Sequence, residues 1–275
     1  MTQVRVRKFD VGTIKPDRIM LAVGKRGSGK SKLLEDLLYN LRDRFDYVLG
    51  MCPTMESSVM LRRCMPGACV YNRFSPAKLE LLVQTAGELA AKGKERHFLV
   101  VLDDVLYDKT VLRSKAFRYL FFNGRHSKIA LCVLCQYLVD MPPDLRANVD
   151  YIFSMKETVL ANRMKLYKMF FGVFYSFQDF EACFERCTQN FECICMDNTL
   201  QSSSPSDCIF WYKANINLPD FKLGSKVFYD LEDQYRRAEG SAPAPPDDAE
   251  PAKKKASIAV LKEGEDDPDS GEEVR

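Results

Sequence analysis

A glycine-rich stretch near the amino terminus constrains this chain more than any other feature. Its residues, in order, are Gly24, Lys25, Arg26, Gly27, Ser28, Gly29, Lys30 and Ser31. They fit the pattern G-x-x-x-x-G-K-[ST], in which backbone N–H groups at a helix amino terminus cradle phosphates. The apolar run 19–23 predicts a buried strand before the motif, and leucines on one helical face follow it. Strand, loop and helix thus come in the required order; a chance glycine-rich turn is the alternative.

Two side chains of the motif predict specific contacts with a bound nucleotide. Lys30 would reach the β- and γ-phosphates of ATP, and the Ser31 hydroxyl would bind Mg²⁺. The side chains of Lys25 and Arg26 could touch phosphate oxygens or simply lie exposed on the surface. The residue types alone do not separate these two alternatives.

Short apolar segments alternate with amphipathic ones along most of the chain. Strands are expected at 19–23, 47–52, 98–104, 129–135, 149–153, 191–196 and 208–212, with an edge strand around 4–6. Helices are expected after the glycine motif and at 56–63, 76–92, 113–122, 142–147, 158–171, 177–186 and 225–237. This alternation predicts an α/β fold, a three-layer P-loop NTPase with a mostly parallel central sheet.

Composition divides the chain into residues 1–237, the expected ATPase domain, and residues 238–275. The second part has eleven acidic and five basic residues and a proline-containing run at 241–246. We expect it to be a disordered acidic tail, because it has few large apolar residues with which to build a core. The whole chain has a formal net charge of +2, so this tail of −6 leaves +8 on residues 1–237. A folded body of that charge favours a polyanionic partner.

Polar side chains follow two of the expected buried strands. Asp103 and Asp104 end the apolar run that begins at residue 98, and Gln136 follows the run 129–135. Parallel sheets bind ligands beyond the carboxyl ends of their strands, where the glycine motif also falls. Asp103 would hold Mg²⁺ through water, and Asp104 would orient or deprotonate the attacking water. Gln136 could sense the γ-phosphate or hold that water. The alternatives are a solvated cap for Asp104 and an ordinary strand end for Gln136.

Arginines supplied by a neighbouring subunit commonly stabilise the transition state of phosphoryl transfer. Arg125, in a turn before a strand, is the first candidate for this role, and Arg146 is the second. Each could instead be a surface charge or bind a DNA phosphate.

The ten cysteines and the absence of long apolar runs indicate the cellular compartment of the protein. Cys183, Cys187, Cys193 and Cys195 cluster, but their spacing is not that of a common zinc site. We therefore expect reduced thiols in the core. No apolar run reaches the length of a transmembrane segment, and the basic amino terminus has no apolar signal region behind it, so we expect a cytosolic protein.

Several segments together resemble a known family. They are residues 24–31, 103–104, 122–126, 136, 145–151, 170–172, 191–193, 197–199 and 210–214. In these segments the chain is similar to the poxvirus-type genome-packaging ATPases of nucleocytoplasmic large DNA viruses, within the FtsK–HerA superfamily. The resemblance covers roughly residues 10–235. The glycine motif alone is generic, and the later segments make the resemblance specific.

The resemblance implies a RecA/FtsK–HerA-like fold and a homo-oligomeric ring, expected to be a hexamer. Such a ring would use ATP and Mg²⁺ to drive double-stranded DNA into a preformed capsid, in contact with capsid or vertex proteins. The implied location is the host cell cytoplasm at the virus assembly site, or the virion. It also implies Asp103 for the metal, Asp104 for the water and Gln136 as sensor, although many members of the superfamily have Glu where Asp104 stands.

Two other functions use the same glycine motif and stay open at this point. One is a small-molecule kinase acting on a nucleoside or nucleotide, and the other is a scaffold that binds nucleotide without hydrolysing it. For the DNA motor, candidate phosphate contacts are Arg62, Arg63, Lys128, Arg163, Lys165 and Lys168.

Overall fold

The structure is a computed structural model that describes residues 5–137 and 141–238 of the 275-residue chain. Its strands are β1 Arg7–Lys8, β2 Ile19–Val23, β3 Tyr47–Met51, β4 Val70–Tyr71, β5 Phe98–Asp103, β6 Ile129–Cys135, β7 Tyr151–Ser154, β8 Glu192–Asp197 and β9 Ile209–Lys213. Its helices are α1 Lys30–Leu41, α2 Met55–Cys64, α3 Pro76–Ala91, α4 Lys115–Asn123, α5 Pro143–Arg146, α6 Leu160–Met169, α7 Phe177–Cys187, α8 Pro205–Cys208 and α9 Lys226–Ala238. The predicted acidic tail lies outside the described residues from residue 239 onward.

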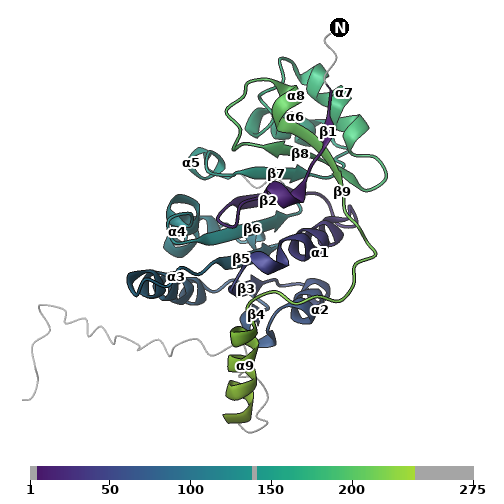
Figure 1. Ribbon diagram of the computed structural model, residues 1–275. Coiled ribbons are helices and arrows are strands. Elements are labelled where there is room, and N and C mark those ends of the chain that lie inside the picture. The colour runs from purple at the N-terminus through teal and green to yellow at the C-terminus, as the bar shows by residue number, and fades with distance from the viewer. Residues whose placement is uncertain (1–4, 138–140, 239–275) are drawn as a thin grey trace, which may run out of the picture. The chain divides into compact units, whose positions relative to one another are not determined.

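The strands form one sheet in the order β1-β9-β8-β7-β2-β6-β5-β3-β4 (Figure 1). From β7 to β4 all neighbours are parallel, and β8 is antiparallel to both β7 and β9. The predicted α/β fold with a mostly parallel sheet is therefore confirmed. The central strands are buried along their whole length, which agrees with their continuous apolar sequences.

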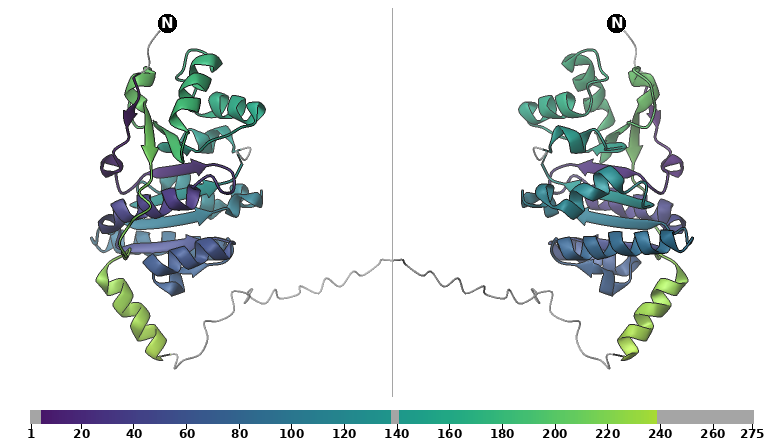
Figure 2. Two further views of the ribbon diagram at one scale, coloured as in Figure 1. Left: turned by 90° about the vertical axis from the view of Figure 1, so that its right-hand side faces the viewer. Right: turned by 90° about the vertical axis from the view of Figure 1, so that its left-hand side faces the viewer.

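Helices cover both faces of the sheet and make three layers (Figures 1 and 2). On one face, the leucine stripe of α1, which includes Leu33 and Leu37, packs in a buried cluster with Ala22 of β2 and Leu99 of β5. On the other face, α3, α4 and α7 pack in a second cluster, to which α4 contributes Phe117. Burying each such side chain stabilises the fold by about 1.5–3 kcal/mol. These two clusters fix the central strands and so fix their carboxyl ends.

Two short elements were not predicted, and most of the other boundaries differ from the expectation by one or two residues. β4 and α8 were not predicted, because Val70–Tyr71 and Pro205–Cys208 are too short to show a period. The edge strand β1 forms at Arg7–Lys8, where it pairs with Phe210 and Trp211 of β9. β8 starts at Glu192 and not at residue 191, because a turn ends there.

Candidate active site

Glycines shape the turn between β2 and α1. Gly29 has φ +98°, a left-handed conformation that side chains rarely adopt, directly before α1 begins at Lys30. A Cβ at Gly24 would lie 2.6 Å from Met155 Cβ and from Ser28 Oγ, so no side chain fits there. The two positions therefore need glycine for different reasons, conformation at residue 29 and space at residue 24.

The residue that caps the amino terminus of α1 is Gly29, which has no side chain, so no side-chain oxygen of the cap accepts from the first N–H groups of the helix. Lys30 is buried, with 7 % of its surface exposed, and its Nζ donates to the carbonyl oxygens of Gly24 at 2.5 Å and Lys25 at 3.3 Å. Both partners are neutral carbonyl groups, and the ammonium charge of Lys30 also interacts with the carboxylate of Asp103. Free N–H groups, a helix amino terminus and a buried cation together make a site for phosphates.

The acid pair lies at the carboxyl end of β5, two strands away from β2 in the sheet. Asp103 is 3 % exposed, and its carboxylate accepts a hydrogen bond from the Ser57 hydroxyl of α2. Burial raises the pKa of Asp103 above its ordinary value, and this hydrogen bond opposes the rise. An ionised Asp103 therefore gains from a nearby cation.

Asp104 sits in a left-handed backbone conformation with φ +54°. Its backbone N–H donates to the carbonyl oxygen of Leu134 at 3.0 Å, which continues the β5–β6 pairing by one residue. Gln136 Nε2 donates to Asp104 Oδ2 at 2.6 Å. The amide and the carboxylate, predicted separately from two strand ends, thus form one polar pair.

A cleft of about 1190 Å³ joins these groups. Its lining includes Lys25, Arg26, Gly27, Gly29, Lys30, Ser31, Asp103, Asp104 and Gln136, together with Thr54, Met55, Glu56, Ser57, Asn190, Phe191, Lys213, Ala214 and Ile216. The space is ample for a nucleoside triphosphate, since ligand pockets commonly measure about 300–1,000 Å³. Gly24 and Ser28 do not line it; Ser28 Oγ is buried without a hydrogen-bond partner. The structure thus brings both acids and Gln136 to the glycine turn.

Lys25 and Arg26 have different surroundings within the loop. Lys25 Nζ forms an ion pair with Glu157 Oε1 at 2.7 Å and a hydrogen bond to Thr158 Oγ1 at 3.2 Å. The Lys25 side chain therefore ties the glycine loop to the segment after β7. Arg26 is exposed and lines the cleft, so its side chain has access to a ligand there.

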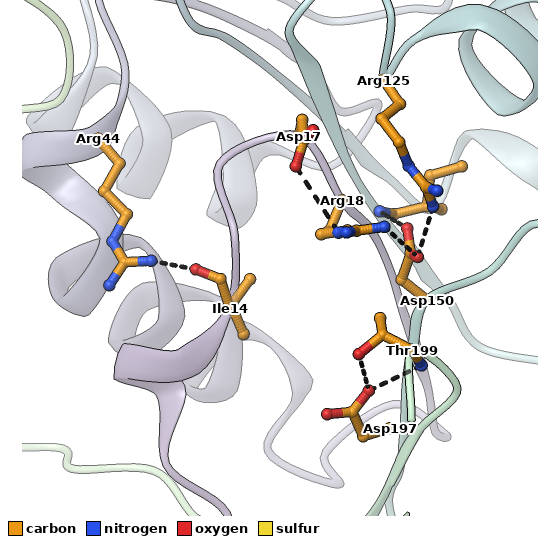
Figure 3. A network of polar contacts seen from close by, with 9 residues as sticks. Ile14, Asp17, Arg18, Arg44, Arg125, Asp150, Asp197 and Thr199 are labelled. Atoms are coloured by element: carbon orange, nitrogen blue, oxygen red, sulfur yellow. Dashed lines mark hydrogen bonds and ion pairs between the residues drawn. The ribbon is translucent and has the colours of Figure 1, made fainter. Parts of the chain in front are cut away.

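Arg125 does not join the cleft of its own subunit. It precedes β6, at the sheet edge opposite the glycine turn, where Arg125 Nη2 lies 2.9 Å from Asp150 Oδ1 (Figure 3). Asp150 also accepts from Arg18 Nη1 at 3.2 Å and from the Ile19 backbone N–H at 2.9 Å. Within one subunit these contacts tie β2, β7 and the turn before β6 together. Arg146 ends α5, also ahead of the amino end of β7. Action of either arginine on a neighbouring subunit stays a prediction.

Sequence reasoning missed Ser57 and Ile216, and it noted Lys213 and Ala214 only within a segment shared with a family. Ser57 contacts Asp103 across 46 residues of chain, and a serine in the first turns of a helix carries no motif that predicts this. Phe191 was noted only as part of a segment shared with a family, because its position beside Gly29 is a tertiary contact that no local pattern indicates.

The cysteines lie mostly in the core. All ten are free thiols, and all but Cys69 are buried. The sulfur atoms of Cys183 and Cys187, one turn apart in α7, are separated by 4.0 Å. Within residues 5–137 and 141–238, no cluster of three or more His, Cys, Asp or Glu side chains could hold a metal ion. In the same residues, no helix combines the length and apolarity needed to cross a bilayer.

Comparison with known proteins gives consistent matches. The model of a family described as Poxvirus A32 protein matches residues 7–169. Uncharacterized protein 088R of Invertebrate iridescent virus 3 is 27% identical over 237 residues, covering 81% of this chain and 91% of that protein. Uncharacterized protein 015R of Frog virus 3 (isolate Goorha) is 29% identical over 226 residues, covering 78% of this chain and 70% of that protein.

Solved structures share the fold at low sequence identity. B204, the DNA-packaging ATPase from Sulfolobus turreted icosahedral virus, superposes with a TM-score of 0.54 at 17% identity. The match covers 74% of this chain and 100% of that one. The pCW3 conjugation coupling protein TcpA, solved with ATPγS, gives a TM-score of 0.52 at 13% identity. That match covers 83% of this chain and 66% of the TcpA chain.

Proposed function

This chain belongs to the Poxvirus A32 protein family, and from that membership we propose that it is an ATP-hydrolysing DNA translocase that packages a double-stranded viral genome into a preformed capsid. One observation carries the proposal: the glycine turn, the acid pair and Gln136 face one cleft. The fold shared with a viral DNA-packaging ATPase supports it. Family membership favours this function over a small-molecule kinase.

Binding of ATP follows from the glycine turn. The free N–H groups of the turn and of α1 would hold the phosphates, and Lys30 would exchange its two carbonyl partners for β- and γ-phosphate oxygens. Arg26, exposed at the cleft, would add a second cation. Lys25 would contribute its backbone N–H, because its ammonium already pairs with Glu157.

The residues present fit a bound Mg²⁺. The Ser31 hydroxyl and the Asp103 carboxylate line the same cleft, and Mg²⁺ prefers such oxygen ligands. The raised pKa of Asp103, caused by burial, fits as well, because a cation would stabilise the ionised form. A metal held there would neutralise charge on the β- and γ-phosphates.

Hydrolysis requires a water placed in line with the γ-phosphate. Asp104 is the candidate to accept the proton of that water, and its left-handed backbone holds the carboxylate at the end of β5. Gln136 holds the same carboxylate by a hydrogen bond of 2.6 Å. Gln136 could also donate to the water or to a γ-phosphate oxygen, and this would couple the state of the nucleotide to β6.

Coupling to DNA requires a positively charged surface and an assembly that encloses a duplex. Residues 1–237 carry a formal charge of +8, so a homo-oligomeric ring, in our proposal a hexamer, would attract phosphates strongly. Among the candidate contacts, Arg62 donates to the Gly67 and Val70 carbonyls and Arg163 pairs with two glutamates, so both have intramolecular roles. Capsid or vertex proteins would be further partners, at the assembly site in the host cytoplasm or in the virion.

ATP hydrolysis by the full chain, measured with and without duplex DNA, tests the proposal. We expect stimulation by duplexes of unrelated sequence and a steep loss of that stimulation as salt rises, because contacts with phosphates release counterions. Polyglutamate serves as a control polyanion without duplex geometry. Hydrolysis that ignores duplex DNA at low salt, or transfer of phosphate to a nucleoside, would contradict the proposal.

A further inference from the structure

Phe191 has a backbone conformation that is unusual for an aromatic residue. The turn 189–192, between α7 and β8, is closed by a hydrogen bond from Glu192 N–H to the Gln189 carbonyl oxygen at 2.8 Å. Its central residues, Asn190 and Phe191, have φ +51° and +63°. Turns with two positive φ values favour Asn followed by Gly. Phe191 therefore stands where glycine would be free of strain.

Burial does not explain why a phenylalanine occupies that position. Phe191 is 70 % exposed, so its ring contributes little to the core. Backbone strain held at an exposed residue is typical of functional sites. A phenylalanine that destabilises this turn is explained if its ring contacts a ligand.

The Phe191 ring lies against the glycine turn. Its Cδ1 is 3.4 Å from the place that a Cβ on Gly29 would occupy, and it lines the same cleft as Lys30 and Ser31. Phosphates bound at the glycine turn would therefore have an aromatic ring beside them.

The order of the strands gives the direction in which a nucleotide must lie. β6 and β5, which end at Gln136 and the acid pair, are on one side of β2, and β7, β8 and β9 are on the other. Hydrolysis needs the γ-phosphate on the acid side. The sugar and base then extend toward the opposite side, where Phe191 precedes β8 and Ala214 and Ile216 follow β9.

We propose that Phe191 is the stacking platform for the base of the nucleotide and that Ala214 and Ile216 complete an apolar base subsite. This rests on the proposed function, because the acid pair sets the orientation. Ile216 is 67 % exposed in the cleft, and Ala214 is half-buried. A planar heteroaromatic base covers such apolar surface and stacks on the ring, a contact that tolerates different bases because each has a π-face.

Binding of two ligands to the full chain tests the subsite. One ligand is a non-hydrolysable ATP analogue and the other is inorganic tripolyphosphate, which has no base; both are titrated with Mg²⁺ in a calorimeter. Phe191→Gly should weaken binding of the ATP analogue roughly 5- to 150-fold, about 1–3 kcal/mol, and leave tripolyphosphate within about twofold. Phe191→Trp should retain affinity for the analogue.

Two controls separate stacking from folding. Phe191→Gly places the preferred residue in the turn, so its melting temperature should equal or exceed that of the wild type. Tyr175→Ala removes another aromatic side chain, 84 % exposed and outside the cleft, and should change neither affinity.

If Phe191→Gly weakened binding of the ATP analogue and of tripolyphosphate equally, the proposal would be overturned, since Phe191 would then support the glycine turn. Unchanged affinity for the ATP analogue would overturn it too. Failure of the proposed function would look different. Hydrolysis by the wild type would then ignore duplex DNA, while Phe191→Gly would still weaken binding of the ATP analogue and leave binding of tripolyphosphate unchanged.

Discussion

Replacing Asp103 by asparagine should make the nucleotide-free protein more stable and should strongly slow hydrolysis. The carboxylate is 3 % exposed at the end of β5, and burial raises its pKa. The nearby carboxylates of Asp104 and Glu56 raise this pKa further, while the Ser57 hydrogen bond and Lys30 lower it. Asparagine keeps the shape and an oxygen acceptor for Ser57 but removes the charge.

The sign of the effect follows from proton binding. Because the pKa of Asp103 is higher in the folded than in the unfolded chain, the folded protein binds more protons in the window between the ordinary value of 3.8 and the raised pKa. Stability of the wild type therefore falls as pH rises through that window. The advantage of the variant should be absent below the ordinary pKa and complete above the raised one.

The stability gained by Asp103→Asn should be that of removing one unfavourable buried charge. A gain of about 0.5–2 kcal/mol is expected. For a domain of this size it corresponds to a rise of about 1–8 °C in Tm. Hydrolysis should fall on the order of 100-fold or more, because a group that stabilises charge in the transition state is lost.

Thermal unfolding followed between about pH 4 and pH 8, beside a Mg²⁺-dependent ATPase assay, measures both effects. Asp43→Asn is the matched control, because the Asp43 side chain is 84% exposed and the same exchange there should leave Tm and activity unchanged. An Asp103→Asn protein that is less stable than the wild type across this range, or that hydrolyses ATP at the wild-type rate, would refute the reasoning.

Four further substitutions test other parts of the structure. Asp150→Ala should cost about 3–5 kcal/mol in the free energy of unfolding, because it leaves buried donors without their carboxylate; Arg125→Ala should cost only about 0.2–1 kcal/mol, since its side chain is 53% exposed. Chemical denaturation measures both, and a large loss of kcat in Arg125→Ala at unchanged stability would instead assign this arginine to a γ-phosphate. Lys30→Ala should weaken ATP binding about 10- to 150-fold in a calorimetric titration, because a charged hydrogen-bond partner of the phosphates is lost, and near-normal affinity would contradict the phosphate contact. Tyr212→Phe removes the hydroxyl that donates to the buried carboxylate of Asp36 and should cost about 1.5–3 kcal/mol; unchanged stability would show that this carboxylate is satisfied without it.

The parts of the site that could be predicted from sequence are those that local patterns determine. The glycine turn specifies its own backbone, and the apolar runs that end at Asp103 and at Gln136 place these side chains at the carboxyl ends of neighbouring strands. Parallel pairing then brings the strand ends together. For that reason one motif and two strand ends were enough to predict a common cleft.

The parts that could not be predicted depend on tertiary contacts. Arg125 stands in the turn before β6, which is parallel to β2, so it lies at the amino edge of the sheet, opposite the glycine turn. Its contact with Asp150 joins segments distant in sequence, and no local pattern indicates it. The Ser57 hydroxyl reaches Asp103 because α2 follows β3, next to β5 in the sheet. The left-handed backbone of Phe191 contradicts residue preferences, so no preference could have indicated it.

Movement along duplex DNA tests the central claim most directly, because it joins the nucleotide site to the proposed work. A third strand annealed to a linear duplex is displaced when a motor passes, and its release can be followed by fluorescence. The wild type should displace it with ATP and Mg²⁺, whereas Asp104→Asn should bind ATP with near-normal affinity and displace nothing. Displacement by Asp104→Asn at the wild-type rate, or no ATP-dependent displacement by a wild type that hydrolyses ATP, would contradict the account.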